Sequence, residues 1–171
     1  MQYICHYSSP LGNILLASDG THLTGLWFEN QKYFAEKLDK NCKEINSFLF
    51  QQAKMWLDTY FSGKEPTISL PIQLNGTAFQ TQVWQILSSI PYGQTMTYGQ
   101  IARVIAKQRG LSHMSAQAVG GAVGHNPISI IVPCHRVLGA DGSLTGYAGG
   151  IERKIALLNL EGFSYKKSGS H

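Results

Sequence analysis

The sequence predicts a mixed α+β fold, in which a small N-terminal α/β domain precedes a helical, winged-helix-like domain. Two observations support this prediction. Apolar stretches alternate with turn signals through the first thirty residues, whereas apolar residues recur at helical spacing from Thr77 onwards. The two patterns meet near Asn75, so we expect one domain over residues 1–75 and a second over residues 76–171.

The N-terminal domain is expected to be an antiparallel sheet covered by one helix. Its apolar runs are separated by two turn sequences, Ser9-Pro10-Leu11-Gly12 and Asp19-Gly20, and Asp-Gly between apolar runs is a hairpin signal. The helix is expected where five residues recur at helical spacing before Gly63: Leu49, Ala53, Trp56, Leu57 and Tyr60. The segment from Gly63 to Gly76 is the expected connection between the domains.

The C-terminal domain is expected to contain four helices. The first should run from Phe79 to Ile90, where Pro91 follows, and the last from Glu152 to Leu160, ahead of Gly162. Between them, Thr97 and Gln100 form a capping box that opens the second helix. The third should run from Ala116 to Val123 after the basic turn Lys107–Gly110, and two short helices joined in this way indicate a helix-turn-helix.

The third of these helices is unusually smooth, because it carries alanines together with Gly120 and Gly121. Each glycine costs a helix interior about 1 kcal/mol relative to alanine, so a thin surface should be required there. Close packing on a neighbouring helix is one explanation. The other is that this helix lies in a narrow groove or against a sugar-phosphate backbone.

The positive charge of the chain is concentrated in its second half. Residues 1–75 carry six lysines and seven acidic residues, for a net charge of −1, whereas residues 76–171 carry eight basic and three acidic residues, for a net charge of +5. Between Glu65 and Asp141 there is no acidic residue, and this interval holds four basic ones: Arg103, Lys107, Arg109 and Arg136. Such a surface favours a polyanionic partner, although an accidental bias on a solvated face would look similar.

The composition excludes several other classes of protein. No apolar stretch reaches the ~20 residues of a membrane span, and the N-terminus does not resemble a signal peptide, so we expect a cytoplasmic protein without a membrane partner. Three cysteines are too few and too scattered for a disulfide framework. We expect no metal and no other cofactor, because the spacing of the candidate zinc ligands matches no recognisable motif: Cys5, His6, His22 and Cys42.

The pentapeptide Pro133-Cys134-His135-Arg136-Val137 is the strongest chemical signal in the chain. It follows the β-branched run Ile128–Val132, which we interpret as a buried strand that delivers Cys134 to a turn. The adjacent imidazole of His135 and guanidinium of Arg136 should favour the thiolate, the nucleophilic form of cysteine. Taken alone, a free cysteine is more often a small buried apolar residue.

The region from Asn126 to Val137, together with Thr145-Gly146-Tyr147-Ala148-Gly149-Gly150, resembles the active site of the O6-alkylguanine-DNA alkyltransferases. The likeness extends from about Gly76 to Gly162. It implies DNA repair by irreversible, single-turnover transfer of an alkyl group from O6-alkylguanine to Cys134, with O4-alkylthymine as a further candidate substrate. It also implies binding in the minor groove of single- or double-stranded DNA and flipping of the target base.

The resemblance assigns roles to individual residues. His135 would act through a water molecule on Cys134, and Glu161 would orient the imidazole. Tyr98 would supply a proton to the guanine ring, and Asn126 would hold the cysteine loop. At the base-binding site, Tyr147 and the backbone of Ala148 would wall the pocket and donate to the guanine oxygen, and backbone groups near Val137 would contact the amino edge of the base. Gly149 and Gly150 would allow the tight geometry of this loop.

The resemblance also implies which residues bind DNA. The smooth helix would bind DNA through Ala116, Ala118, Gly120 and Gly121. Arg103 and Arg136, which lie in the acid-free interval, are expected to add positive charge to this surface. At the position of the arginine that enters the vacated base stack, this chain has Gln117. Glutamine can fill space and form hydrogen bonds, but it lacks a charge and a planar cation for stacking.

Three functions compete at this point. A monomeric, single-turnover alkyltransferase is the first. A DNA-binding lesion sensor without chemistry is the second, and the presence of Cys134 argues against it because relatives of that kind lack the cysteine. A Cys-His hydrolase is the third, and it would require a base in direct contact with the sulfur and an oxyanion hole.

Overall fold

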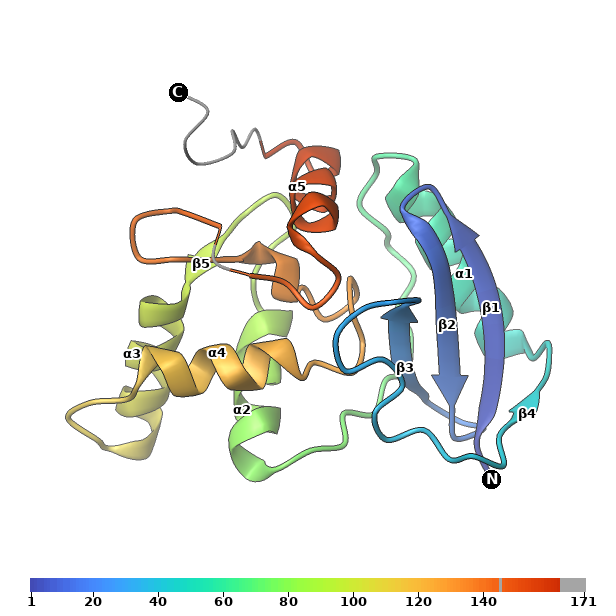
Figure 1. Cartoon of the computed structure of the whole chain (residues 1–171), viewed down its shortest axis with the longest axis horizontal. Helices are drawn as coiled ribbons and strands as arrows, with labels where there is room; N and C mark the ends of the chain where they lie inside the picture. The colour runs from blue at the N-terminus through green and yellow to red at the C-terminus, as the bar shows by residue number, and fades with distance from the viewer. Residues whose placement is uncertain (145, 164–171) are drawn as a thin grey trace. The chain divides into compact units, whose positions relative to one another are not determined.

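A computed structural model describes residues 1–144 and 146–163 of the chain. The fold is mixed α+β, as predicted, with a sheet in the N-terminal part and helices in the C-terminal part (Figure 1). The last eight residues of the predicted second domain, 164–171, lie outside the described residues. No helix of the described part of the chain is both long and apolar enough to span a membrane.

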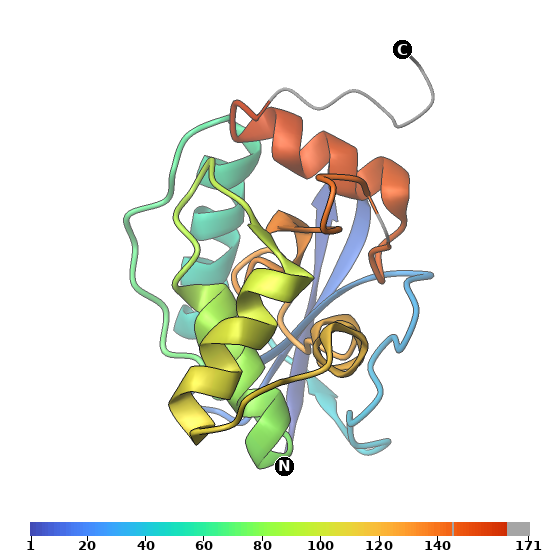
Figure 2. The ribbon, with the colours of Figure 1, turned by 90° about the vertical axis from the view of Figure 1, so that its left-hand side faces the viewer.

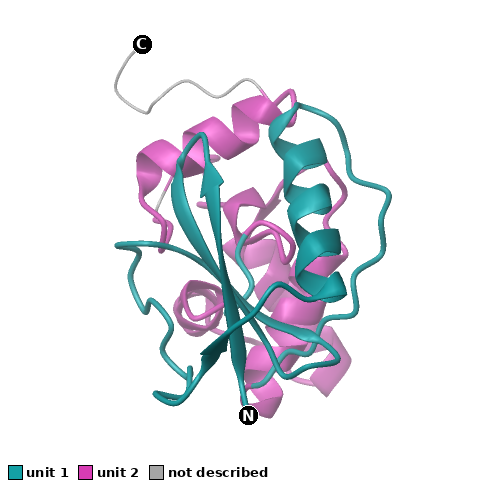
Figure 3. Ribbon diagram, turned by 90° about the vertical axis from the view of Figure 1, so that its right-hand side faces the viewer, with its two compact units in different colours: residues 1–75, 127–129 teal, residues 76–126, 130–171 magenta. Residues whose placement is uncertain are grey.

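The chain forms two compact units, shown in teal and magenta in Figure 3. The first comprises residues 1–75 together with residues 127–129, and the second comprises residues 76–126 and 130–171. The return of residues 127–129 to the first unit was not predicted. Residues 127–129 immediately precede the segment that carries Cys134, so the chain passes from the first unit back to the second just before the thiol.

The sheet of the first unit has the strand order β3-β2-β1-β4. Strands β1 (Tyr3–Ser9), β2 (Gly12–Ser18) and β3 (Leu23–Phe28) are antiparallel, as predicted from their turn sequences. The two-residue strand β4 (Lys43–Glu44), which pairs with β1 in parallel, was missed because two residues carry no periodicity. Helix α1 (Phe48–Phe61) packs beside β1, behind the sheet in Figure 1.

The outer edge of β3 is closed by two segments from later in the chain. The backbone of Leu23 bonds to Pro71 and Gln73, with N···O distances of 2.8 and 3.0 Å. The backbone of Leu26 bonds to Pro127 and Ser129, at 2.9 and 3.0 Å. An open edge would expose unpaired N–H and C=O groups, so these segments complete the sheet.

Among its described residues, the second unit contains four α-helices, a short 3-10 helix and a minimal sheet: α2 (Ala78–Ser88), β5 (Met96–Thr97), α3 (Tyr98–Arg109), α4 (Ala116–Gly124), η1 (Cys134–Arg136), β6 (Val137–Leu138) and α5 (Ile151–Leu160). The predicted capping box of Thr97 and Gln100 is confirmed at the start of α3. Helices α3 and α4 pack together, and Figure 2 shows α4 nearly end-on beside α3. The indole Nε1 of Trp84 donates to the carbonyl of Ala122 at 2.8 Å, which fixes α4 on α2.

The predicted strand at Ile128–Val132 is wrong. Only Ile128 forms a β-bridge, with Leu26, and the following residues form turns. Ile130 has a φ of 71°, in the left-handed region that a β-branched residue rarely adopts. The run is apolar because it is buried, and burial alone does not distinguish a core strand from a core turn.

Candidate active site

Cys134 is the first residue of a short 3-10 helix, η1 (Cys134–Arg136), whose N-terminal flank is Pro133. The turn is closed by the backbone N–H of Arg136, which donates to the Pro133 carbonyl at 3.0 Å. Cys134 itself is 4% exposed. The chain therefore presents the thiol at a tight turn, as predicted, but holds it away from solvent in this conformation.

Asn126 braces the segment before the cysteine. Its side-chain Nδ2 donates to the Val132 carbonyl at 2.7 Å, and the same carbonyl accepts the backbone N–H of Cys134 at 2.8 Å. The Asn126 amide is buried just beyond the end of α4. One side chain thus connects the helix to the turn that carries the thiol.

His135 and Glu161 meet in the interior although they are far apart in sequence. The imidazole Nε2 lies 2.6 Å from Glu161 Oε2, and both side chains are fully buried. Because a carboxylate can only accept, Nε2 carries the proton of the neutral ring, which leaves the lone pair on Nδ1. The ring is thereby oriented to accept a proton on its Nδ1 side.

Arg136 does not have the exposed position that a DNA contact requires. Its Nε donates to Glu161 Oε1 at 2.8 Å and its Nη1 donates to the Ile90 carbonyl at 2.7 Å, and the residue is 8% exposed. This burial and pairing are incompatible with a phosphate contact in this conformation. The prediction that Arg136 binds DNA is therefore replaced by a structural role in the Glu161 network.

The same network includes the turn before β5. The backbone N–H of Gly93 donates to Glu161 Oε1 at 2.9 Å. Gly93 has a φ of 78°, and a Cβ atom there would lie 3.2 Å from the Glu161 carbonyl oxygen, so glycine suits both the turn and the close approach. Glu161 therefore binds three residues from two parts of the unit, His135 and Arg136 in η1 and Gly93 in the turn before β5.

Burial dominates the electrostatics of the two candidate catalytic groups. Burial raises the pKa of the Cys134 thiol, and this effect is opposed by a hydrogen bond from Asn126, the positive charge of Lys154 and a hydrogen bond from Tyr147. Burial also lowers the pKa of His135, against the opposing influence of Glu161. At neutral pH the imidazole is therefore a neutral base rather than a cation that stabilises the thiolate.

The small sheet pairs the segment that follows the cysteine turn with the segment that precedes α3. Met96 pairs with Val137 and Thr97 with Leu138, so β5 ends where α3 begins at Tyr98. The aromatic ring of Tyr98 lies against α4, where a Cβ atom added to Gly120 would be 3.7 Å from it. Val137 therefore lies opposite Met96 at the start of this parallel pair, and Tyr98 follows Thr97 at its other end.

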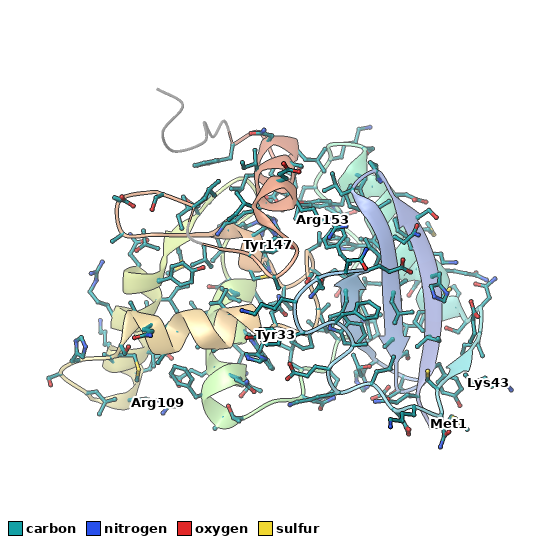
Figure 4. The ribbon with its side chains drawn as sticks, in the orientation of Figure 1. Met1, Tyr33, Lys43, Arg109, Tyr147 and Arg153 are labelled. Carbon is teal, nitrogen blue, oxygen red and sulfur yellow. The ribbon has the colours of Figure 1, made fainter. Side chains whose placement is uncertain are left out.

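The residues predicted to wall the base site lie in the loop before α5. The backbone N–H of Gly150 donates to the Tyr147 carbonyl at 2.9 Å, and Gly150 has a φ of 96° at the start of the helix. Ala148 and Gly149 lie between them, and Arg153 of α5 donates to the Gly149 carbonyl at 3.2 Å. Figure 4 shows Tyr147 in this loop and Arg153 on α5.

Lys154 is a residue of this region that the sequence reasoning missed. It is fully buried in α5, where its Nζ donates to the carbonyls of Val137 and Gly146. A signal was present, because helical spacing places Lys154 on the apolar face with Ile151, Ile155 and Leu158. A lysine at a core position of an amphipathic helix requires a reason.

Helix α4 exposes several of its small residues to solvent, although Ala122 is buried. Its N-cap, Ser115, accepts the backbone N–H of Ala118 at 3.2 Å. Four residues of the predicted DNA surface are exposed: Ala116, Gln117, Ala118 and Gly121. A Cβ atom at Gly121 would meet nothing within 4 Å, and one at Gly120 would make only ordinary contact, so close helix packing does not explain these glycines.

The predicted basic residues of α3 differ in their surroundings. Arg103 and Lys107 are exposed. Arg109, labelled in Figure 4, donates through Nε to Gln82 at 2.6 Å and lies over the ring of Phe79 at 5.5 Å. Arg103 and Lys107 are therefore better placed than Arg109 to reach a phosphate.

The candidate zinc ligands remain unassembled. Within residues 1–144 and 146–163, no three His, Cys, Asp or Glu side chains lie together in a way that could hold a metal ion. All three cysteines are free thiols, and Cys5 and Cys42 belong to the first unit. The second unit holds a different set of groups, the Cys134 thiol and its sequence neighbour His135, whose neutral imidazole is oriented by Glu161.

Comparison with known families matches nearly the whole chain. The model of the 6-O-methylguanine DNA methyltransferase DNA-binding domain matches residues 78–163, and that of the 6-O-methylguanine DNA methyltransferase ribonuclease-like domain matches residues 3–74. The two matched ranges meet near the boundary between the structural units.

Individual relatives are similar over most of their length. A methylated-DNA--protein-cysteine methyltransferase of Haemophilus influenzae is 42% identical over 98% of this chain and 90% of the relative. One of Methanosarcina acetivorans is 43% identical over 94% of this chain and 98% of the relative. A crystal structure of Mycobacterium tuberculosis OGT in complex with DNA is 44% identical, with a TM-score of 0.80 over 93% of this chain and 92% of that chain.

Proposed function

We propose, since this chain belongs to the 6-O-methylguanine DNA methyltransferase family, that it repairs DNA by transferring one alkyl group from guanine O6 to its own Cys134. One observation carries the proposal: Cys134, His135 and Glu161 are all buried, and the Glu161 carboxylate lies 2.6 Å from the imidazole of His135, the residue after the cysteine. The Mycobacterium tuberculosis relative that was crystallised with DNA supports DNA as the partner.

The proposed reaction is a substitution at the alkyl carbon. The thiol proton passes through a water molecule to Nδ1 of His135, while the Nε2 proton stays on the Glu161 side. The thiolate attacks the alkyl carbon, the carbon–O6 bond breaks, and its electrons return to the purine. Tyr98 donates a proton to the purine ring, so that neutral guanine leaves, and the proton held by His135 passes to solvent as Tyr98 recovers one from it. Backbone groups near Val137 and Ala148 hold the base.

The thioether that forms offers water no good leaving group, so we propose that each chain reacts once. This stoichiometry separates an alkyltransferase from a Cys-His hydrolase, which would turn over through an acyl intermediate. Cys134 also separates this chain from a lesion sensor that only binds. O4-alkylthymine is a second proposed substrate, since it too presents an alkylated exocyclic oxygen.

We propose that α4 lies in the minor groove and that the target base is flipped out of the duplex. The exposed glycine at position 121, which no intramolecular contact requires, supports a surface made for close approach. Exposed Arg103 and Lys107 would neutralise phosphates. A monomer acting in the cytoplasm, where thiols stay reduced, is the proposed setting.

The direct test is the reaction with an oligonucleotide that contains O6-methylguanine. We expect the intact chain to gain the mass of one methyl group, on the peptide that contains Cys134, with guanine restored in the DNA. The same oligonucleotide without the methyl group is the control. Repeated turnover, or methylation at Cys5 or Cys42 instead, would contradict the proposal.

The exposed Gln117 gives a prediction about base flipping. We expect Gln117→Arg to accelerate methyl transfer from duplex DNA by about tenfold, because arginine adds attraction to phosphates and a plane that stacks in the vacated site. Transfer from free O6-methylguanine base needs no flipping and should be nearly unchanged. The measurement compares both single-turnover rates in both proteins.

Exposed Gln108, which lies on α3 instead of α4, provides the matched control as Gln108→Arg. If Gln117→Arg accelerated transfer equally from duplex DNA and from free base, the substitution would act on the alkyl-transfer step instead of base flipping. No acceleration on either substrate would mean that Gln117 does not limit flipping.

A further inference from the structure

Lys154 is a buried cation that the proposed mechanism leaves without a role. Its relative exposure is 0%, and its Nζ donates to the Val137 carbonyl at 2.5 Å and to the Gly146 carbonyl at 2.9 Å. Both acceptors are neutral. They satisfy two of the three ammonium protons, but they do not compensate the charge.

The charge of Lys154 has no carboxylate partner among the residues that the structure describes. No Asp or Glu oxygen of residues 1–144 and 146–163 lies within 4.0 Å of its Nζ. A buried ammonium without a counter-charge is unfavourable, since transfer from water costs several kcal/mol after relaxation. Apolar packing alone would therefore disfavour a lysine at this position.

Three segments supply the titratable and charged groups around Lys154. They are α5 with its C-terminal cap, the segment from Cys134 to Leu138, and the loop that contains Gly146. Their groups are Glu152, Arg153, Glu161, Cys134, His135, Arg136 and Tyr147.

Only one of these groups is suited to balance the lysine. Glu161 already accepts hydrogen bonds from His135 and Arg136, and Glu152 is exposed. Lys154 binds the carbonyl of Val137, whose own backbone N–H donates to the Cys134 carbonyl, so the ammonium lies at the turn that carries the buried thiol, and the two charges interact electrostatically. A thiolate at Cys134 would be the missing anion.

We propose that the Lys154 ammonium is the counter-ion of the Cys134 thiolate, and so a positioning residue that makes the sulfur ionisable inside the protein. The inference rests on the proposed function, in which Cys134 is the alkyl acceptor. Lys154 acts through the sulfur and through the two carbonyls that it binds. The thiol proton still leaves toward His135, and the lysine lowers the cost of the negative charge that remains.

The position of the lysine adds a dependence on pH. Burial lowers the pKa of Lys154 to about 8, against the opposing influence of a charge on Cys134. The ammonium is therefore present at neutral pH and is lost as the pH rises through about 8. Its help to the thiolate should be largest at neutral pH and should disappear in alkali.

The test measures the reaction of Cys134 with iodoacetamide from about pH 5 to about pH 10, followed by mass spectrometry on the peptide that contains Cys134. We expect Lys154→Met to raise the apparent thiol pKa by about one unit and to slow the reaction at neutral pH by about tenfold. The two rates should converge in alkali, where the wild-type lysine is neutral. Lys154→Arg, which keeps the charge, should restore part of the rate.

Arg153→Met is the matched control, because it removes one positive charge from the neighbouring position of α5, and it should leave the thiol pKa unchanged. A rate ratio between wild type and Lys154→Met that does not vary with pH would indicate packing alone and would overturn the inference. An unchanged thiol pKa would overturn it as well.

A second measurement uses only the wild-type chain and so avoids variants that fold poorly. The pKa of Lys154, followed by nuclear magnetic resonance of the side chain, should fall when Cys134 is converted to a neutral thioether, since the counter-charge is then lost. An unchanged lysine pKa would contradict the pairing. If methyl is transferred from DNA to Cys134 but neither the thiol pKa nor the Lys154 pKa shifts, only this inference is refuted. If both pKa shifts are seen but no methyl is transferred, only the proposed function is refuted.

Discussion

Replacing Cys134 with serine should abolish methyl transfer, with a loss of more than about a thousandfold. The hydroxyl is a far weaker nucleophile because it ionises much less readily than a thiol. Serine is nearly isosteric with cysteine, so η1 and the hydrogen bond from the Cys134 backbone to Val132 should persist. DNA binding should therefore be retained, and we expect similar affinity by fluorescence anisotropy beside no methyl gain by mass spectrometry.

Cys42→Ser is the control for this experiment. Cys42 is a partly buried free thiol of the first unit, so its loss should affect neither transfer nor binding. Residual transfer in Cys134→Ser, or loss of transfer in Cys42→Ser, would place the acceptor elsewhere. Loss of DNA binding in Cys134→Ser would mean that the thiol also supports the fold of the binding surface.

Glu161→Gln should damage both the chemistry and the stability of the protein. The carboxylate accepts from His135, Arg136 and Gly93, and its side chain is fully buried. Glutamine has the same shape but replaces one oxygen by an NH2 group, which cannot accept a hydrogen bond. We expect the free energy of unfolding to fall by about 3 kcal/mol, because Arg136 would be left as a buried charge without its anion.

The rate of transfer should fall by about a hundredfold in the same variant, since the imidazole would lose the group that orients it and stabilises its protonated form. Urea denaturation and single-turnover kinetics measure the two effects. Glu152→Gln, which changes an exposed carboxylate in the first turn of α5, should alter neither. An active and stable Glu161→Gln variant would refute the role of the carboxylate.

Much of the fold could be predicted because its regular elements are long enough to show a period. The capping box at Thr97 and the helix that follows are local features, and the hairpin turns between the first three strands are local as well. The strands β4, β5 and β6 contain two residues each, so they carry no periodic signal. Their existence depends on tertiary pairing.

The candidate site could be predicted only in part. A pair such as His135 and Glu161 is formed by folding, and the family resemblance supplied it where spacing could not. Arg136 was assigned to DNA because it lies in an acid-free interval, but its partner comes 25 residues later, beyond that interval. For Lys154, the sequence shows a charge on an apolar helix face without showing the thiol that it accompanies.

The closure of β3 by residues 127–129 has a consequence for the order in which the chain can fold. Leu26 pairs with a segment that is synthesised long after β1, β2 and α1, so the first unit cannot be completed early during translation. Its last hydrogen bonds form across a long loop, whose closure is entropically costly, and long-range pairing of this kind slows folding. Until residue 129 has emerged, the β3 edge near Leu26 stays open to pairing with other chains. We therefore expect the nascent chain to be most prone to aggregation before the segment that carries the thiol is made.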